Sequence, residues 1–153
     1  MSINEYVFLY TRDLKRLKNE ILAYPTEESL WVKIPGTINS GGVICQHLIG
    51  NLRTYIGLPI GNFHYVRDRE AEFSARLFSK ETLLQQVDLL LEIIPDSIGR
   101  LSDNDLSGEY PHEILTVNPV QSYSLVLSHL VMHLSWHTGQ INYHRRIVEA
   151  ALS

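Results

Sequence analysis

Residues 129–141 read HLVMHLSWHTGQI, in a segment that runs from Pro119 to Ala150 with no proline after its first residue. The three histidines of this stretch, His129, His133 and His137, follow one another at intervals of four residues. This spacing places them within about 80° of one another around a helix. A chain of this composition would show only about 0.01 such triples by chance. The segment therefore predicts one long helix with a polar stripe on the side that a bundle would bury.

Histidines one helical turn apart are typical of a metal site, because their imidazoles lean the same way and can reach one ion. Two ligands rarely hold an ion tightly, so a third should come from another helix. His47 is the candidate, because it lies in the middle of a helix predicted from Gly42 to Tyr55, where a lone charged imidazole among apolar residues would be costly. The predicted metal ligands are therefore His47, His133 and His137.

Two further polar side chains are predicted to support this site. Asn51 follows His47 by one helical turn, and His129 precedes His133 by one turn, which leaves His129 between a supporting role and ligation. The alternative for any of the histidines is a core residue whose ring is satisfied by a carbonyl or a hydroxyl group. The histidines predicted to lie outside the site, in loops or in a structural role, are His64, His112 and His144.

The rest of the chain predicts three more helices. Apolar residues at spacings of three and four mark the first and the third of these helices, capping residues precede the second and the third, and proline or glycine follows each one. These helices cover residues 3–22, 42–55, and 79 to either 95 or 99. Residues 58–78 are predicted to be a long connection, with at most one exposed turn in the charged run 67–73. The sequence therefore indicates an all-α fold of four main helices in one domain, residues 1–153.

Composition and motifs exclude several classes of function. The 153 residues carry a net charge of −4 and no basic run, so neither nucleic acid nor a membrane is an expected partner. No segment approaches the roughly 18 apolar residues of a membrane span, and the first residues lack the basic start of a signal peptide, so a cytoplasmic location is expected. The single Cys45 is expected in the core. HLSWH at 133–137 lacks the glutamate of the HExxH metalloprotease motif, and the chain has no P-loop and no GxSxG nucleophile motif.

A mid-chain helix with a central His47, followed by a long helix that reads HLSWHTGQI at 133–141, resembles the DinB and YfiT-like superfamily of metal-dependent enzymes. The resemblance covers nearly the whole chain. It implies a four-helix bundle of up-down-down-up topology with one long crossover, and a divalent ion on three histidines, commonly Ni²⁺ or Zn²⁺ and alternatively Fe²⁺ or Mn²⁺. By position the ligands would be His47, His133 and His137, while Gly139 would let another helix approach closely.

Members of this superfamily with an assigned chemistry are S-transferases that use low-molecular-weight thiols. The resemblance therefore implies a metal-dependent enzyme with a small-molecule substrate, of which a low-molecular-weight thiol is the first candidate. A hydrolase on the same ligands, and a non-catalytic metal-binding or dimerisation module, stay open as alternatives. A homodimer is expected, because the apolar faces of a small bundle often extend into a partner. Trp136 and Tyr143 are expected to serve in packing.

Overall fold

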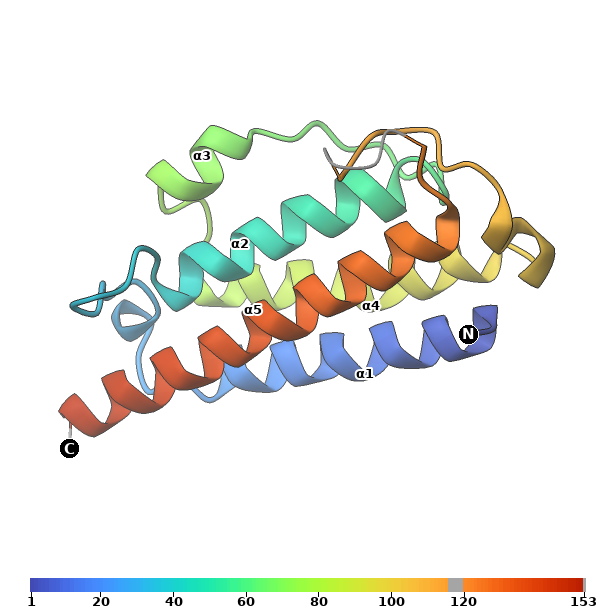
Figure 1. Ribbon diagram of the computed structural model, residues 1–153. Coiled ribbons are helices and arrows are strands. Elements are labelled where there is room, and N and C mark those ends of the chain that lie inside the picture. Colours follow the sequence, from blue (N-terminus) through green and yellow to red (C-terminus); the bar gives the residue numbers. More distant parts are fainter. Residues whose placement is uncertain (116–119, 153) are drawn as a thin grey trace.

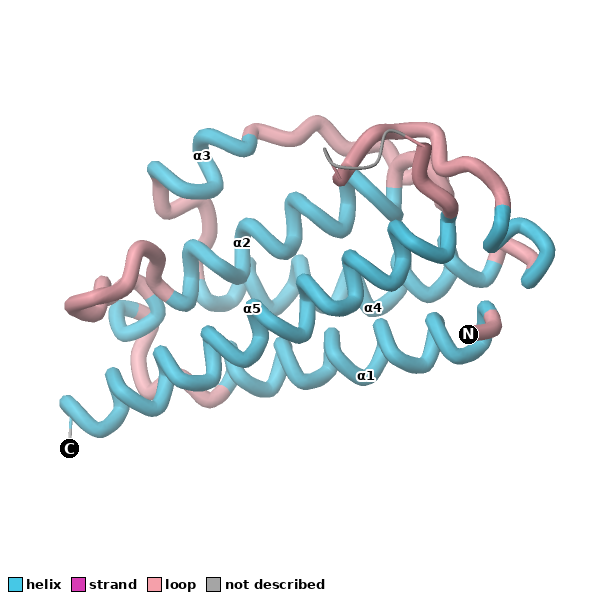
Figure 2. The backbone as a smooth tube through the Cα atoms, in the orientation of Figure 1, coloured by secondary structure: helices cyan, strands magenta, loops and turns pink. Residues whose placement is uncertain are grey.

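The computed structural model describes residues 1–115 and 120–152, and within these residues the chain forms helices and no β-strand. The tube in Figure 2 shows long helices packed side by side and joined by loops, with a short helix beside them. These helices are α1 (Ile3–Leu22), α2 (Gly41–Leu52), α3 (Arg69–Ser74), α4 (Lys80–Gly99) and α5 (Tyr123–Leu152). The predicted all-α class is confirmed.

The helices begin where the sequence places serine caps. The side chains of Ser2, Ser40 and Ser79 accept hydrogen bonds from backbone N–H groups of the first turns of α1, α2 and α4. Such caps satisfy donors that a helix start leaves without a partner. At the other end α4 continues through Pro95 to Gly99, the later of the two predicted ends. Helix α5 begins at Tyr123, three to four residues after its predicted start; Pro119 itself lies outside the described residues.

The four long helices form an up-down-down-up bundle. Helices α1 and α5 run in one direction and α2 and α4 in the other (Figure 1). Helix α1 packs against α4 and α5, and α2 packs against the same two helices. Because α2 and α4 are parallel, the chain between them must return along the bundle, and α3 lies in this crossover. The long crossover implied by the resemblance is confirmed, whereas α3 replaces the predicted single exposed turn.

Helix α2 is enclosed to an unusual degree: all but one of its residues are buried. The bundle covers one side of it and the crossover covers the other. The side chain of Gln46 attaches the crossover, since its amide N–H groups donate to the carbonyls of Glu72 and Ala75 and its carbonyl accepts from the Leu77 N–H. A polar side chain on this helix therefore needs a partner within the protein.

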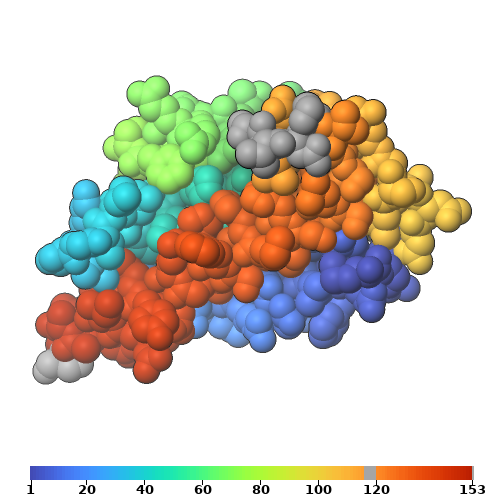
Figure 3. All heavy atoms as spheres, in the orientation of Figure 1, coloured from blue at the N-terminus to red at the C-terminus, as the bar shows by residue number. Residues whose placement is uncertain are grey.

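Helix α5, by contrast, lies across the front face of the molecule, between α1 and the crossover (Figure 3). Its inner side is buried through Leu127, Leu130, Leu134 and Ile141. None of the helices in the described part of the chain combines the length and the apolar composition that a membrane span requires. Polar side chains on the edge of α5 that faces α2 thus lie between the buried core and solvent.

Candidate metal centre

The histidines predicted to bind a metal ion meet where α2 and α5 pack together. The Nε2 atom of His133 lies 3.3 Å from Nε2 of His47 and 3.1 Å from Nε2 of His137. One ring nitrogen from each of the three residues lies within 4.8 Å of the other two. Two ligands from adjacent turns of α5 and one from α2 therefore converge on a single point.

The spacing of these nitrogens fits one divalent ion. Zn–N distances of about 2.0–2.1 Å in tetrahedral geometry would separate two ligand nitrogens by about 3.3–3.4 Å, close to what the imidazoles show. At such distances either a ring N–H or a positive ion lies between the two nitrogens, because two facing lone pairs would repel. The donor set is also the right one, because neutral imidazole binds zinc, nickel and iron. The three histidines can hold a metal ion, and the donor set does not select which one.

The orientation of His47 is set by an ion pair on the crossover. Oε2 of Glu72 lies 3.2 Å from Nδ1 of His47, and Arg67 pairs with both oxygens of the same carboxylate at 2.7 Å. The side chains of Glu72 and Arg67 are only 3% and 11% exposed. When Nδ1–H donates to this carboxylate, the Nε2 lone pair of His47 is left for a metal ion, the arrangement that carboxylates commonly impose on metal-binding histidines.

Gly50 makes room for this carboxylate. A Cβ atom at Gly50 would collide with the Glu72 side chain, so only a glycine at this turn of α2 lets the carboxylate lie against the helix. The sequence analysis missed Glu72 and Arg67, because a charged run reads as exposed. The available signal was weak: a carboxylate and a guanidinium five residues apart, in a segment too polar to be a core helix.

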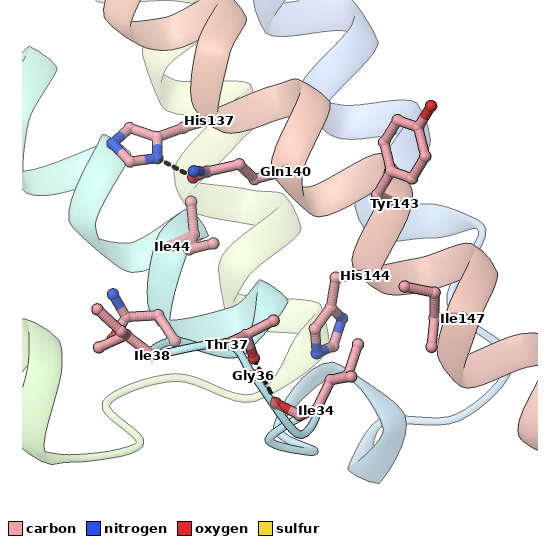
Figure 4. Close-up of a pocket in the computed structure, with 11 residues that line it drawn as sticks. Ile34, Gly36, Thr37, Ile38, Ile44, His137, Gln140, Tyr143, His144 and Ile147 are labelled. Atoms are coloured by element: carbon pink, nitrogen blue, oxygen red, sulfur yellow. Dashed lines mark hydrogen bonds between the residues drawn. The ribbon is translucent and has the colours of Figure 1, made fainter.

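Gln140 holds His137 in the same way that Glu72 holds His47. Its Oε1 lies 2.7 Å from Nδ1 of His137 (Figure 4), so Nδ1–H donates to it and Nε2 is directed toward His133. Nδ1 of His133 is buried and has no hydrogen-bond partner among the described residues. Two of the three imidazoles thus have their tautomers fixed by neighbouring side chains.

The surroundings keep the three imidazoles uncharged. Burial lowers the pKa of His47 and of His137. Burial, and then repulsion from His137 and His47, lowers the pKa of His133 to about 3. Neutral imidazole is the form that binds metal ions, so the cluster is ready for ligation at neutral pH.

The predicted supporting residues lie beside this cluster. The ring of His129 is 6.2 Å from that of His133. Asn51 is buried, and its Oδ1 atom has no hydrogen-bond partner in the described part of the chain. Neither residue belongs to the converging set, and a supporting role for them stays a prediction.

The remaining histidines lie where the sequence analysis placed them. His64 and His112 are exposed. His144 is buried, and its ring is held at both nitrogens: Nε2–H donates to the Val32 carbonyl at 2.8 Å, and Nδ1 accepts from the Tyr24 hydroxyl at 2.7 Å. These bonds fix the orientation of the ring, and burial lowers the pKa of His144. The predicted structural role of His144 is confirmed.

Two cavities border the cluster, and His137 lines both. One, of about 350 Å³, lies over the outer side of α5, where Trp136 forms part of its wall. The other, of about 440 Å³, lies between α5 and the loop that precedes α2, with Tyr143 at its edge (Figure 4). Trp136 and Tyr143 are 70% and 69% exposed, so their predicted role in packing is wrong.

Gly139 also differs from expectation. A Cβ atom added there would meet nothing within 4 Å, so no helix of this chain uses it for a close approach. The resemblance had implied such a contact, but Gly139 lies on the exposed side of α5. Cys45 is buried as predicted, and burial raises its pKa to about 12, so its thiol is unreactive at neutral pH.

Comparison with known proteins agrees with this architecture. Residues 4–151 match the family described as "Protein of unknown function (DUF1572)". The crystal structure of a DinB-like protein from Bacillus cereus has the same fold, with a TM-score of 0.74 and 17% sequence identity over 97% of this chain and 93% of the other. No curated protein sequence matches the chain significantly. The predicted DinB-like fold is confirmed.

Proposed function

Because the chain belongs to the DUF1572 family, whose description states no function, we propose from the site itself that the protein is a metal-dependent enzyme. Its ligands are His47, His133 and His137, and thiol S-transfer is its first candidate reaction. The convergence of three neutral imidazole nitrogens beside two open cavities carries this proposal.

A structural metal site closes its coordination sphere with protein ligands, whereas a catalytic site keeps a position for water or substrate. Among the described residues, the converging set has three members and no fourth histidine, cysteine or carboxylate. Cavities also reach His133 and His137 from the outer side of α5. These features favour catalysis over an ion that merely cross-links two helices.

A divalent ion held there would lower the pKa of a bound water or thiol, and so supply a nucleophile near neutral pH. The protein's own part is to orient the imidazoles, through Glu72 on His47 and Gln140 on His137, while burial keeps the rings neutral. In thiol transfer the sulfur forms a bond to an electrophilic carbon, the bond to the leaving group breaks with its electron pair, and the thiol proton passes to solvent. In the hydrolytic alternative, water takes the place of the thiol. Ni²⁺ or Zn²⁺ is the proposed ion.

Metal content tests the proposal first. The protein, purified without a histidine tag, should contain about one divalent transition metal ion per chain. The double variant His133→Ala/His137→Ala should contain none, while the matched variant His64→Ala/His112→Ala, which removes two exposed histidines, should keep the ion. Unchanged metal content in the first variant would show that the ligands are assigned wrongly.

Activity is tested next, with a panel of low-molecular-weight thiols and an electrophilic acceptor. Conjugation should require the metal and should persist in Cys45→Ser, because the thiol comes from the substrate. Conjugation that survived complete metal removal, or that disappeared with Cys45, would contradict the mechanism. Absence of turnover with every thiol would favour the hydrolase or the binding module.

A further inference from the structure

The cavity between α5 and the loop before α2 has a lining that selects for one class of ligand. We propose that this cavity binds the uncharged, largely apolar body of a small-molecule substrate beside the metal centre. The inference rests on the proposed function and adds a substrate class to it.

The cavity continues the packing of α2 against α5 beyond the three histidines. Ile44 precedes His47 by three residues on α2, and Gln140 follows His137 by three residues on α5, so both lie next to the ligands on the same side. In Figure 4 His137 and Gln140 lie at one end of the cavity, and the loop crosses its other end. A molecule in the cavity would therefore reach the edge of the centre with one end.

Isoleucine side chains supply the apolar lining. They come from three parts of the chain, which the loop, α2 and α5 bring together: Ile34, Ile38, Ile44 and Ile147. The volume of about 440 Å³ falls within the range of small-molecule sites. Burial of a ligand's apolar surface against these side chains would provide most of the binding free energy.

Charged groups are missing from this lining. None of the residues that the structure assigns to the wall is Asp, Glu, Lys or Arg. The histidine at the far end, His144, already has both ring nitrogens engaged by Tyr24 and Val32. A carboxylate or an ammonium group would thus enter the cavity without an ionic partner, and the loss of its hydration would weaken its binding.

The neighbouring groove shows that charge is available nearby. Ile38 and Asn39 separate the cavity from an open groove toward α3, whose wall includes Lys33, Arg69 and Glu70. The cavity thus has an uncharged lining, whereas the groove on the other side of Ile38 and Asn39 has charged residues in its wall. This difference indicates that the cavity suits the uncharged acceptor of a transfer reaction. A thiol that carries carboxylates would have to bind outside it.

A matched set of probes tests the inference. The protein as purified is labelled with ¹³C in the δ1 methyl groups of isoleucine and titrated with 4-nitrobenzyl alcohol, 4-nitrobenzoate and 4-nitrobenzylamine. The neutral alcohol should shift the methyl signals of Ile38, Ile44 and Ile147 saturably. The anion and the cation should bind at least about tenfold more weakly. Equal affinity for all three, or no shift of these methyl groups, would overturn the inference.

A charge placed at the cavity wall sharpens the test. Ile147 is about half exposed on α5, so Ile147→Lys should fold, and it should reverse the preference in favour of the benzoate. Val120→Lys adds the same charge at an exposed residue outside the cavity lining, and it should leave the preference unchanged. A reversal in both variants would show a bulk charge effect and overturn the inference.

Metal content measured on the same sample separates the two proposals. Selective binding of the alcohol by a chain that holds no metal would support the cavity and contradict the metal-dependent enzyme. A chain that holds its metal and shows no preference among the probes would contradict the cavity alone.

Discussion

At the scale of single residues, the orientation of one imidazole depends on three other residues. Glu72 accepts from His47, Arg67 neutralises Glu72, and Gly50 leaves the space that the carboxylate occupies. The carboxylate is buried with its charge paired, so the loss of either partner would leave an uncompensated charge inside the protein. Substitutions in this group should therefore affect metal binding more than the removal of one hydrogen bond suggests.

Replacement of the carboxylate by an amide gives the first prediction. Glu72→Gln should weaken metal binding by about 10- to 100-fold, because the partner of a ligating histidine fixes its tautomer and raises its basicity. Competition against a chromophoric chelator measures the change. Glu70→Gln, at an exposed acid of the same helix, is the control and should bind metal like the unmodified protein. Equal effects of the two substitutions would show that Glu72 does not position His47.

A pair of glycines gives the second prediction. Gly50→Ala should lower the free energy of unfolding by about 1–3 kcal/mol and also weaken metal binding, because the new methyl group displaces Glu72. Gly139→Ala meets open space, so it should raise stability by about 0.5–1 kcal/mol through the better helix propensity of alanine. Urea unfolding of both variants measures the two changes. A stable Gly50→Ala with full metal affinity would contradict the packing described here.

At the scale of secondary-structure elements, the sequence determines the long helices and leaves the crossover open. The Ile3–Leu22 helix follows from its apolar spacing, and the histidine spacing places two candidate ligands one turn apart on α5. Helix α3 was predicted only as a single turn, because its six residues are too few to show a helical period, and the contacts of Gln46 that attach the crossover to α2 are long-range. Long-range contacts of this kind have no signature in local periodicity.

The exposed aromatic residues of α5 show a second limit of sequence reasoning. Periodicity indicates which side of a helix is apolar, but α5 is apolar on more than one side. Trp136 and Tyr143 therefore looked like core residues, and only the position of α1 and α2 around α5 shows that they face outward. The three converging histidines could be predicted, because polar residues are unusual on the side of a helix that a bundle buries. Glu72 could not be predicted, because it lies in a segment where charged residues are common.

The histidines of α2 and α5 give the third prediction, which concerns pH. Burial lowers the pKa of His133 to about 3, whereas the pKa of a histidine in the unfolded chain is about 6.5. The unfolded chain therefore binds a proton that the folded chain does not, and the stability of the metal-free protein should fall as pH drops from about 6.5 toward 3. His47 and His137, whose pKa values are also lowered, add to the loss.

Urea midpoints of the metal-free protein between pH 7.5 and pH 4 measure this dependence. His133→Phe keeps a ring at the site without a titrating group, so its stability should fall less over the same range. The control, His64→Phe, removes an exposed histidine and should keep the full dependence. If the three curves were parallel, His133 would not be the group responsible.

At the scale of the whole molecule, the bundle and the proposed metal centre should be separate sources of stability. The core is a continuous cluster of leucine, isoleucine, valine and tyrosine side chains from α1, α2, α4 and α5. The three histidines lie at its edge rather than at its centre. A chain of this length buries enough apolar surface to fold without a metal ion.

Chelation gives the fourth prediction. Removal of the ion should lower the melting temperature and leave the helical circular dichroism at 25 °C intact, because the ion stabilises the native state by mass action and the core remains. Thermal scans with and without chelator, after dialysis, measure the shift. Loss of the helical signal at 25 °C would mean that the metal is structural, and would favour the non-catalytic alternative.

The outer face of α5 gives the fifth prediction. Residues 123–144 contain no charged Asp, Glu, Lys or Arg, and Met132, Trp136 and Tyr143 are 63%, 70% and 69% exposed. Exposed apolar surface of this kind is typical of an interface, so the homodimer expected from the sequence should form here. Sedimentation velocity should show a dimer for the protein, a monomer for Trp136→Glu and a dimer for Val66→Glu, at an exposed crossover residue. A monomeric unmodified protein would rule out this dimer.

The distribution of the ligands along the chain also bears on the order in which the protein assembles. His133 and His137 are four residues apart, whereas His47 is 86 residues from His133. His133 and His137 could bind one ion together while the rest of the chain is still unfolded. The ion would then stabilise the first turn of α5, whose formation is the unfavourable step in helix formation. Binding of His47 to the same ion then closes a loop over more than half of the chain. Contacts between residues so far apart in sequence form more slowly than local contacts. An ion bound early would act as a nucleation point for α5, and its coordination would be complete only when α2 docks.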